Sequence, residues 1–289
     1  VKSAESRGMR VTGSELVGLI PLKAMLDAGK YFLKKQKRST GVSEEELIRI
    51  TVKSLGLDDL SPFDPNKKII EFLLRNEKKN KLIKMNLREF ANETASESPA
   101  PGGGSISAYI GALGISLATM VANLSSHKKG WDDRWEEFSK WAEKGQQLKD
   151  ELLKLVDEDT HAFNRIMESF SLPKNSEEEK KIRTEAIQDA TKNAIEVPLR
   201  VMQLAYDSFD IIEAMAKDGN PNSVSDAGVG ALCTRSAVLG AYLNVKINAG
   251  GLKDDMLRKN FLANADDLKS KAISREETIL KVVESKMNA

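Results

Sequence analysis

One acidic residue interrupts the apolar face of a long predicted helix. Apolar side chains recur at spacings of three and four over residues 135–171, and this spacing places Asp159 between Val156 and Phe163 on that face. A buried carboxylate is costly unless it is paired or protonated, and burial raises its pKa toward the range useful for proton transfer at neutral pH. Asp159 is therefore a candidate proton-transfer group. The alternative is a structural carboxylate that pairs with a lysine or caps another helix.

The helical period also assigns the residues around Asp159 to faces. The apolar side chains of its own face are those of Leu152, Leu155, Val156, Phe163, Ile166 and Met167. The polar neighbours fall on other faces, and we expect an ordinary surface position for Asp157, Glu158, Thr160, His161 and Asn164.

A proline- and glycine-rich turn is the second feature with chemical potential. Consecutive glycines allow unusual backbone conformations and a close approach to a ligand. Ser105 is expected to be the N-cap of the helix that follows. The free N–H groups and partial positive charge of a helix N-terminus favour an anion such as a carboxylate or phosphate. The turn consists of Pro101, Gly102, Gly103, Gly104 and Ser105.

The helix after this turn has no charged residue over positions 106–124, a stretch of 19 residues that is long enough to span a membrane. A helix without a polar face is normally buried in a protein core or in a membrane, and small residues let another helix approach closely. Its serines, glycines and alanines lower its hydropathy, so the pattern favours a buried helix of a bundle. Small residues recur at spacings of three or four: Ser107, Gly111, Gly114, Ala118 and Ala122.

Four further polar residues are weaker candidates for binding. Asn244 and Asn248 stand one helical turn apart and either face a ligand together or tie helix ends to backbone groups. Asp226 lies in the first turn of its predicted helix, where an acid is expected for the helix dipole alone. Lys174 lies at a break between two helices and is either an anion ligand or simply solvated.

Composition limits the function classes. The chain has 289 residues, enough for two domains, and its 44 Lys and Arg nearly balance 43 Asp and Glu, which argues against a nucleic-acid partner. Its single cysteine, Cys233, favours a reducing, cytoplasmic compartment. With only His127 and His161 besides, a His/Cys metal site is not expected, and both histidines are assigned to the surface. The chain begins without a methionine or the apolar core of a signal peptide, so we expect it to be a piece of a longer protein.

The first 76 residues mix strand and helix signals. β-branched residues with a Gly-Ser break indicate a strand, and amphipathic periodicity indicates helices. Ser43 and Glu46 are spaced as a capping box. The expected elements are a strand at 9–21 and helices at 22–37, 43–55 and 67–75. A basic linker at 77–85 follows.

From residue 86 onward every segment has helical character. Asn86 and Glu89 form a further capping pair, and Ser225 is expected to cap a later helix. The expected fold is mainly α: an all-helical bundle at 86–289, preceded by a small α/β fragment at 1–76. The expected helices are 87–95, 106–124, 135–171, 176–197, 198–218, 226–248 and 254–287.

These segments together resemble the formiminotetrahydrofolate cyclodeaminase family. The resemblance rests on SPAPGGGSISAYIGALGISLATMVANLS, LVDEDTHAF and GAYLNVKIN, and it covers about residues 86–289. Separately, RVTGSELVGLIPLKAML and LGLDDLSPFDP resemble the end of a glutamate formiminotransferase domain. The order of the two pieces matches the fused bifunctional enzymes of the family. The larger, N-terminal portion of the transferase, where that family keeps its catalytic histidine, has no counterpart here, so transferase activity is not expected from this chain alone.

The resemblance implies a site and a reaction. It implies a dimerising helical domain, which builds a larger homo-oligomer in the fused enzymes, with the folate near subunit contacts. It places the catalytic carboxylate at Asp159 and a folate site at the glycine-rich turn. It also adds Lys174, Asp226, Asn244 and Asn248 to the folate site. The substrate would be a tetrahydrofolate derivative, with or without a polyglutamate chain, and no metal or redox cofactor would be required.

The implied reaction is cyclisation of 5-formiminotetrahydrofolate to 5,10-methenyltetrahydrofolate with release of ammonia, a step of histidine degradation and one-carbon metabolism. Asp159 would move a proton between the two nitrogens. Two alternatives stay open: a methenyltetrahydrofolate cyclohydrolase, whose reaction passes through a tetrahedral centre on the same carbon, and a non-catalytic helical oligomerisation module.

Overall fold

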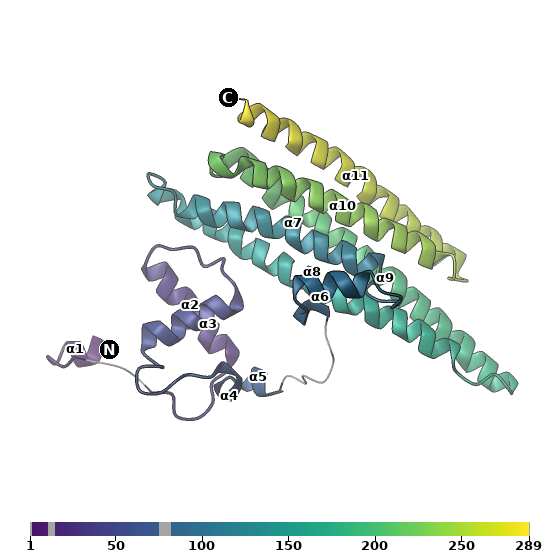
Figure 1. Cartoon of the computed structure of the whole chain (residues 1–289), viewed down its shortest axis with the longest axis horizontal. Coiled ribbons are helices and arrows are strands. Elements are labelled where there is room, and N and C mark those ends of the chain that lie inside the picture. Colours follow the sequence, from purple (N-terminus) through teal and green to yellow (C-terminus); the bar gives the residue numbers. More distant parts are fainter. Residues whose placement is uncertain (1, 11–14, 75–81, 289) are drawn as a thin grey trace. The chain divides into compact units, whose positions relative to one another are not determined.

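The computed structural model of the chain (Figure 1) describes residues 2–10, 15–74 and 82–288. The chain forms two compact units. One unit comprises Val1–Lys79 with Ser126–Glu143, and the other comprises Asn80–Ser125 with Lys144–Ala289. The described residues form helices and a single isolated β-bridge.

The first unit is a small helical cluster. Its apolar core contains Met25, Ile48, Val52 and Ile69. The hydroxyl of Ser43 accepts the N–H of Glu46 at 3.3 Å, as the capping pattern predicts. The helices are α1 (Lys2–Glu5), α2 (Leu22–Lys35), α3 (Glu44–Leu55), α4 (Pro65–Lys68) and α5 (Ile70–Leu74), and the 3-10 turn η2 (Asp132–Arg134) also belongs to this unit.

The predicted strand at 9–21 is not seen in the described part of this unit. Residues 11–14 lie outside the described ranges, and among the others only Ile20 pairs, in a parallel bridge with Ile69. The α/β character expected for residues 1–76 is therefore not shown. Most of the predicted linker at 77–85 also lies outside the described residues, and its last residues form the short 3-10 helix η1 (Leu82–Lys84).

The second unit is built from long helices, as the sequence predicts. Asn86 and Glu89 form the expected reciprocal capping box at the start of α6. Of the long helices, α10 packs against both α9 and α11. The helices are α6 (Leu87–Thr94), α7 (Gly103–Ser126), α8 (Trp135–Phe170), α9 (Glu177–Asp218), α10 (Val224–Ala249) and α11 (Asp255–Met287), with η3 (Pro221–Ser223) before α10. The first residues of α8 and the last of α7 belong to the other unit.

Small residues bury α7 against α10. A Cβ atom added to Gly114 would lie 2.7 Å from Oγ1 of Thr234 and 2.9 Å from the carbonyl oxygen of Gly230, so the two backbones approach closely only because both positions are glycine. Gly111 packs in the same way on Ala237. Among the described residues α7 is the one helix long and apolar enough to cross a membrane, and 61% of its most apolar window is buried inside the protein. The predicted buried helix is thus present.

The prediction that residues 176–197 and 198–218 form two helices is wrong. Pro198 lies inside the continuous helix α9. A proline has no N–H, so the carbonyl of Ala194, four residues earlier, loses its helical partner. The side-chain amide of Asn248 on α10 donates to that carbonyl oxygen at 2.7 Å. A neighbouring helix therefore supplies the missing hydrogen bond.

Replacing Asn248 with alanine should lower the free energy of unfolding by about 1–3 kcal/mol, because the buried Ala194 carbonyl is left without a donor. Urea denaturation measures this change. Asn244→Ala is the matched control, since its amide donates at 2.9 Å to Gly240 of the same helix. Adding Pro198→Ala restores an N–H for Ala194, so the loss caused by Asn248→Ala should shrink in that background. An undiminished loss would contradict this role.

Candidate functional site

Antiparallel packing of α7 and α8 places Asp159 at the first turn of α7. Thr119 of α7 lies beside Gly145 of α8, and Gly111 lies beside Leu152. Further along these two helices, Ser105 of α7 contacts Asp159 of α8. The predicted carboxylate and the glycine-rich turn, 54 residues apart in sequence, thus meet at one place.

Asp159 is half-buried and bonded through one oxygen. The backbone N–H of Ser105 donates to Oδ2 at 2.8 Å, and the Ser105 hydroxyl donates to the same atom at 2.9 Å. Burial raises the pKa of Asp159 above its ordinary value, and the two hydrogen bonds from Ser105 partly offset this rise. No lysine or arginine of the described residues pairs with Asp159, so the ion-paired alternative for this carboxylate is not found.

The glycines of the turn make room for this carboxylate. A Cβ atom on Gly104 would overlap Oδ1 of Asp159 and lie 2.5 Å from its Cγ. Asp159 therefore lies directly against the α7 backbone, which a side chain at Gly104 would prevent. A Cβ on Gly103 would lie 3.2 Å from the amide nitrogen of Asn244, whereas one on Gly102 would meet nothing closer than 3.8 Å.

Ser105 is not the N-cap of α7, contrary to expectation. The helix begins at Gly103, and the N–H of Ile106 donates to the Gly102 carbonyl at 3.0 Å. Ser105 thus lies within the first turn, fully buried. Its hydroxyl donates across to Asp159 of α8 instead of accepting a backbone N–H of its own helix. Pro101 precedes the turn, is buried, and follows a cis peptide bond after Ala100.

Asn244 joins this group from a third helix. It lies near the end of α10, with its amide beside Gly103 and donating to the carbonyl of Gly240. The first turn of α7, the carboxylate of α8 and one amide of α10 thus converge. The predicted site residues that the structure brings together are Gly103, Gly104, Ser105, Asp159 and Asn244, with Pro101 and Gly102 next to them in the chain.

Three predicted residues lie elsewhere. Asn248 is engaged with Ala194 of α9. Asp226 lies in the first turn of α10, about 27 Å along the helix axis from Asn244 at 1.5 Å per residue. Lys174 is exposed and follows the end of α8, which is about 17 Å along the axis from Asp159. For these three, a contact with folate stays a prediction. The helix of Asp226 begins at Val224, so Ser225 is not its cap.

Two other assignments on α8 are wrong. Asp157, expected on the surface, is 8% exposed and accepts the N–H of Leu82 at 2.7 Å. Phe163 and Met167, expected in the core, are 37% and 55% exposed. Because α7 begins beside Asp159, it does not extend along α8 past that residue. Phe163 and Met167 are therefore exposed, whereas Ile166 on the same face is half-buried.

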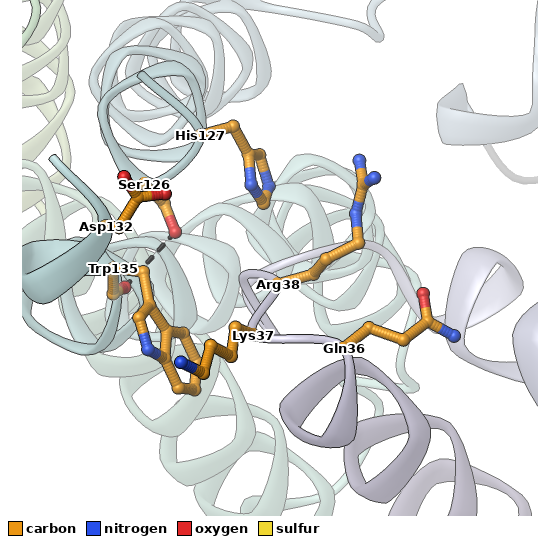
Figure 2. Close-up of a pocket in the computed structure, with 7 residues that line it drawn as sticks. All are labelled: Gln36, Lys37, Arg38, Ser126, His127, Asp132 and Trp135. Carbon is orange, nitrogen blue, oxygen red and sulfur yellow. Dashed lines mark hydrogen bonds between the residues drawn. The ribbon is translucent and has the colours of Figure 1, made fainter. Parts of the chain in front are cut away.

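A separate pocket lies within the first unit (Figure 2). It has a volume of about 410 Å³ and is lined by Gln36, Lys37, Arg38, Ser126, His127, Asp132 and Trp135. The Ser126 hydroxyl donates to the Trp135 carbonyl at 3.1 Å, as Figure 2 shows. His127 is exposed as predicted, and its pKa is lowered by partial burial and then by Arg38. This pocket contains none of the predicted site residues.

The described residues contain no group of three or more His, Cys, Asp or Glu side chains that could hold a metal ion. The chemistry available at the converging turn is that of one half-buried carboxyl group, its hydroxyl partner and a backbone turn at which Gly103 is exposed.

Comparison with known proteins identifies two matching family models. Residues 86–267 match the model described as formiminotransferase-cyclodeaminase, and residues 1–75 match the formiminotransferase domain. The formimidoyltransferase-cyclodeaminase of Rattus norvegicus is 34% identical over 286 residues, which are 99% of this chain and 53% of that protein. The chain thus spans about half the length of the curated relatives of this kind.

Two shorter proteins match about 70% of this chain. The methenyltetrahydrofolate cyclohydrolase of Methylorubrum extorquens is 36% identical over 202 residues, covering 70% of this chain and 97% of that protein. The crystal structure of formiminotetrahydrofolate cyclodeaminase from Thermotoga maritima is similar with a TM-score of 0.63 at 29% identity, covering 71% of this chain and 98% of that one. The structural similarity therefore extends over nearly the whole of the Thermotoga chain.

Proposed function

Because the chain belongs to the formiminotransferase-cyclodeaminase family, we propose that its second unit, built from the long helices, is a formimidoyltetrahydrofolate cyclodeaminase, an ammonia-lyase. It would convert 5-formiminotetrahydrofolate to 5,10-methenyltetrahydrofolate and ammonia. The observation that carries the proposal is the half-buried carboxylate of Asp159, seated against the glycine-rich turn that opens α7. The Thermotoga protein named for this activity supports it through its fold.

The proposed reaction needs two things from the protein. The aryl amine nitrogen of the folate attacks the carbon of the protonated formimino group. The resulting tetrahedral carbon is bonded to one hydrogen and to three nitrogens, which are the attacking nitrogen, the pterin nitrogen and the amine that departs. Holding the two groups in attacking geometry supplies an entropic contribution that reaches about 7–11 kcal/mol in favourable cases. A proton must then pass from the attacking nitrogen to the departing one, so that ammonia leaves.

Asp159 suits the proton transfer. As a carboxylate it accepts the proton of the attacking nitrogen, and as the acid it returns that proton to the departing amine. Its raised pKa brings the two forms closer in free energy at neutral pH, which eases both transfers. The substrate supplies the attacking nitrogen itself, so a covalent role for Asp159 is not needed.

A cyclohydrolase is the second candidate. The Methylorubrum relative is named methenyltetrahydrofolate cyclohydrolase, and the match covers 97% of its length. Hydrolysis of the methenyl product would use the same carboxylate to deprotonate water. The match of residues 1–75 to a formiminotransferase domain favours the cyclodeaminase, since formimino transfer and cyclisation are consecutive steps on one folate. We propose no transferase activity for this chain by itself. A homo-oligomer in the cytoplasm is the expected setting of the enzyme.

One assay distinguishes these functions. Purified protein is supplied with 5-formiminotetrahydrofolate, and methenyl absorbance and free ammonia are followed together. The cyclodeaminase predicts equal amounts of both products. A cyclohydrolase predicts instead that added methenyltetrahydrofolate disappears faster than the formimino substrate is converted. Folded protein that releases no ammonia would contradict the proposal, and failure to bind any folate would favour the oligomerisation module.

A further inference from the structure

The two oxygens of Asp159 have different surroundings. Oδ2 accepts both the N–H and the hydroxyl of Ser105. Oδ1 has no hydrogen-bond donor among the described residues and lies over the backbone of Gly104. The carboxylate is thus held by one oxygen while the other is left free.

We propose that Ser105 is a positioning residue, which anchors Oδ2 so that Oδ1 is the oxygen that exchanges the proton with the substrate nitrogens. This inference rests on the proposed cyclodeaminase function and assigns roles within its site. It differs from the sequence-based expectation, in which Ser105 contacts the folate directly.

The chemistry of a carboxyl group supports this division. When a carboxylate takes up a proton, one oxygen becomes a hydroxyl and the other a carbonyl, and the carbonyl oxygen is the better acceptor. An oxygen that already accepts two hydrogen bonds is therefore favoured as the carbonyl, and the proton goes to the other oxygen. In this site the incoming proton is directed to Oδ1, and the Ser105 hydroxyl keeps its bond in both states of the shuttle.

Charged neighbours do not cause the shift in the pKa of Asp159. On its own helix the titratable groups within two residues are the buried Asp157 and the exposed Glu158 and His161. On α7 the only titratable side chain is that of Tyr109, whose ring contacts Phe90 of α6. Near the end of α10, Lys246 lies over the ring of Tyr242. None of these groups is among the causes that shift the pKa of Asp159, which are its burial and the two bonds from Ser105.

Replacing Ser105 with alanine removes the hydroxyl and keeps the backbone N–H. We expect kcat for methenyl formation to fall about 10- to 100-fold, the range for losing one charge-assisted hydrogen bond, with KM changed much less. Because the lost bond lowers the pKa of Asp159 in the native protein, that pKa should rise, and the acid limb of the kcat–pH profile should move to higher pH. Ser105→Cys keeps most of the volume with a weaker donor and should give an intermediate shift.

Ser116→Ala is the matched control. Its hydroxyl belongs to the same helix and donates to the carbonyl of Ala112 at 2.6 Å, away from Asp159. It should leave kcat and the acid limb unchanged. Unfolding midpoints of all variants show that they are folded, and Ser105→Cys supplies the readout if the alanine variant unfolds.

The outcomes separate this inference from the proposed function. If Ser105→Ala has wild-type kcat and an unshifted acid limb while Asp159→Asn is inactive, the positioning role is refuted and the cyclodeaminase stands. A rise in KM with unchanged kcat would make Ser105 a folate ligand and would also refute the inference. Full activity of Asp159→Asn would remove Asp159 from the reaction altogether.

Discussion

Replacing Asp159 with asparagine is expected to lower kcat for methenyl formation by about 10²–10⁴-fold, the usual contribution of general acid–base catalysis. The amide has the shape of the carboxylate but does not take up or release the proton. Its oxygen still accepts the N–H and hydroxyl of Ser105, so the contact between α7 and α8 should remain. Initial rates at saturating substrate measure the loss.

The matched control lies two residues away on the same helix. Asp157 is also buried, but its carboxylate accepts the N–H of Leu82 and lies away from the glycine-rich turn. Asp157→Asn should reduce stability, because a charged acceptor of a buried N–H becomes a neutral one, and should leave kcat nearly unchanged. Equal losses of kcat in the two variants would indicate a general effect of disturbing α8 and would contradict a specific role for Asp159.

The raised pKa of Asp159 also predicts whether Asp159→Asn gains or loses stability. A carboxyl whose pKa is higher in the folded protein than in the unfolded chain contributes stability that is complete below the unfolded value, about 3.9, and is lost as the pH rises through the folded value. At neutral pH the buried charge is therefore unfavourable, and Asp159→Asn should be as stable as the wild type or more so. As the pH falls, the free energy of unfolding of the wild type should rise relative to that of the variant. Urea denaturation at several pH values measures this difference. Such a gain in stability with a loss of activity is typical of a catalytic group.

The sequence identified Asp159 because a carboxylate on an apolar face violates the helical period, and this signal is local to one helix. It could not identify Asp157 in the same way, because its partner, the N–H of Leu82, lies 75 residues away. Phe163 and Met167 keep the apolar period but are exposed, since α7 starts beside Asp159 and does not cover these two side chains. Periodicity shows which face is apolar, whereas the lengths of neighbouring helices decide how much of it is buried.

The remaining differences also arise from partners supplied by other helices. A serine after a glycine turn is typical of an N-cap, but the Ser105 hydroxyl bonds to α8 because Asp159 offers a stronger, charged acceptor. Pro198 predicts a helix break from local chemistry, and the break is absent because Asn248 donates to the freed carbonyl. Two asparagines one turn apart consequently have different roles: Asn244 lies at the converging site and Asn248 completes α9.

Replacing Gly104 with alanine has two effects on stability, which are similar in size and opposite in direction. Alanine is favoured over glycine in a helix by about 1 kcal/mol, so propensity alone predicts a more stable α7. The added Cβ, however, would overlap Oδ1 of Asp159 and lie 2.5 Å from its Cγ, and overpacking of this kind costs about 1–3 kcal/mol. We expect a net loss of about 0–2 kcal/mol of stability. The loss of kcat should be about 100-fold or more, because the carboxylate must leave the position from which it reaches the substrate.

Three neighbouring glycines make this prediction a graded test. A Cβ on Gly102 has its nearest contact at 3.8 Å, one on Gly103 lies 3.2 Å from the Asn244 amide, and one on Gly104 collides with Asp159. The kcat losses of the three alanine variants should therefore rise in that order, and only Gly104→Ala should alter the acid limb of the pH profile. In an Asp159→Gly background the collision is absent, so Gly104→Ala should then stabilise the protein through helix propensity alone. Destabilisation that persists in that background would mean that the side chain of Asp159 is not what excludes a Cβ at position 104.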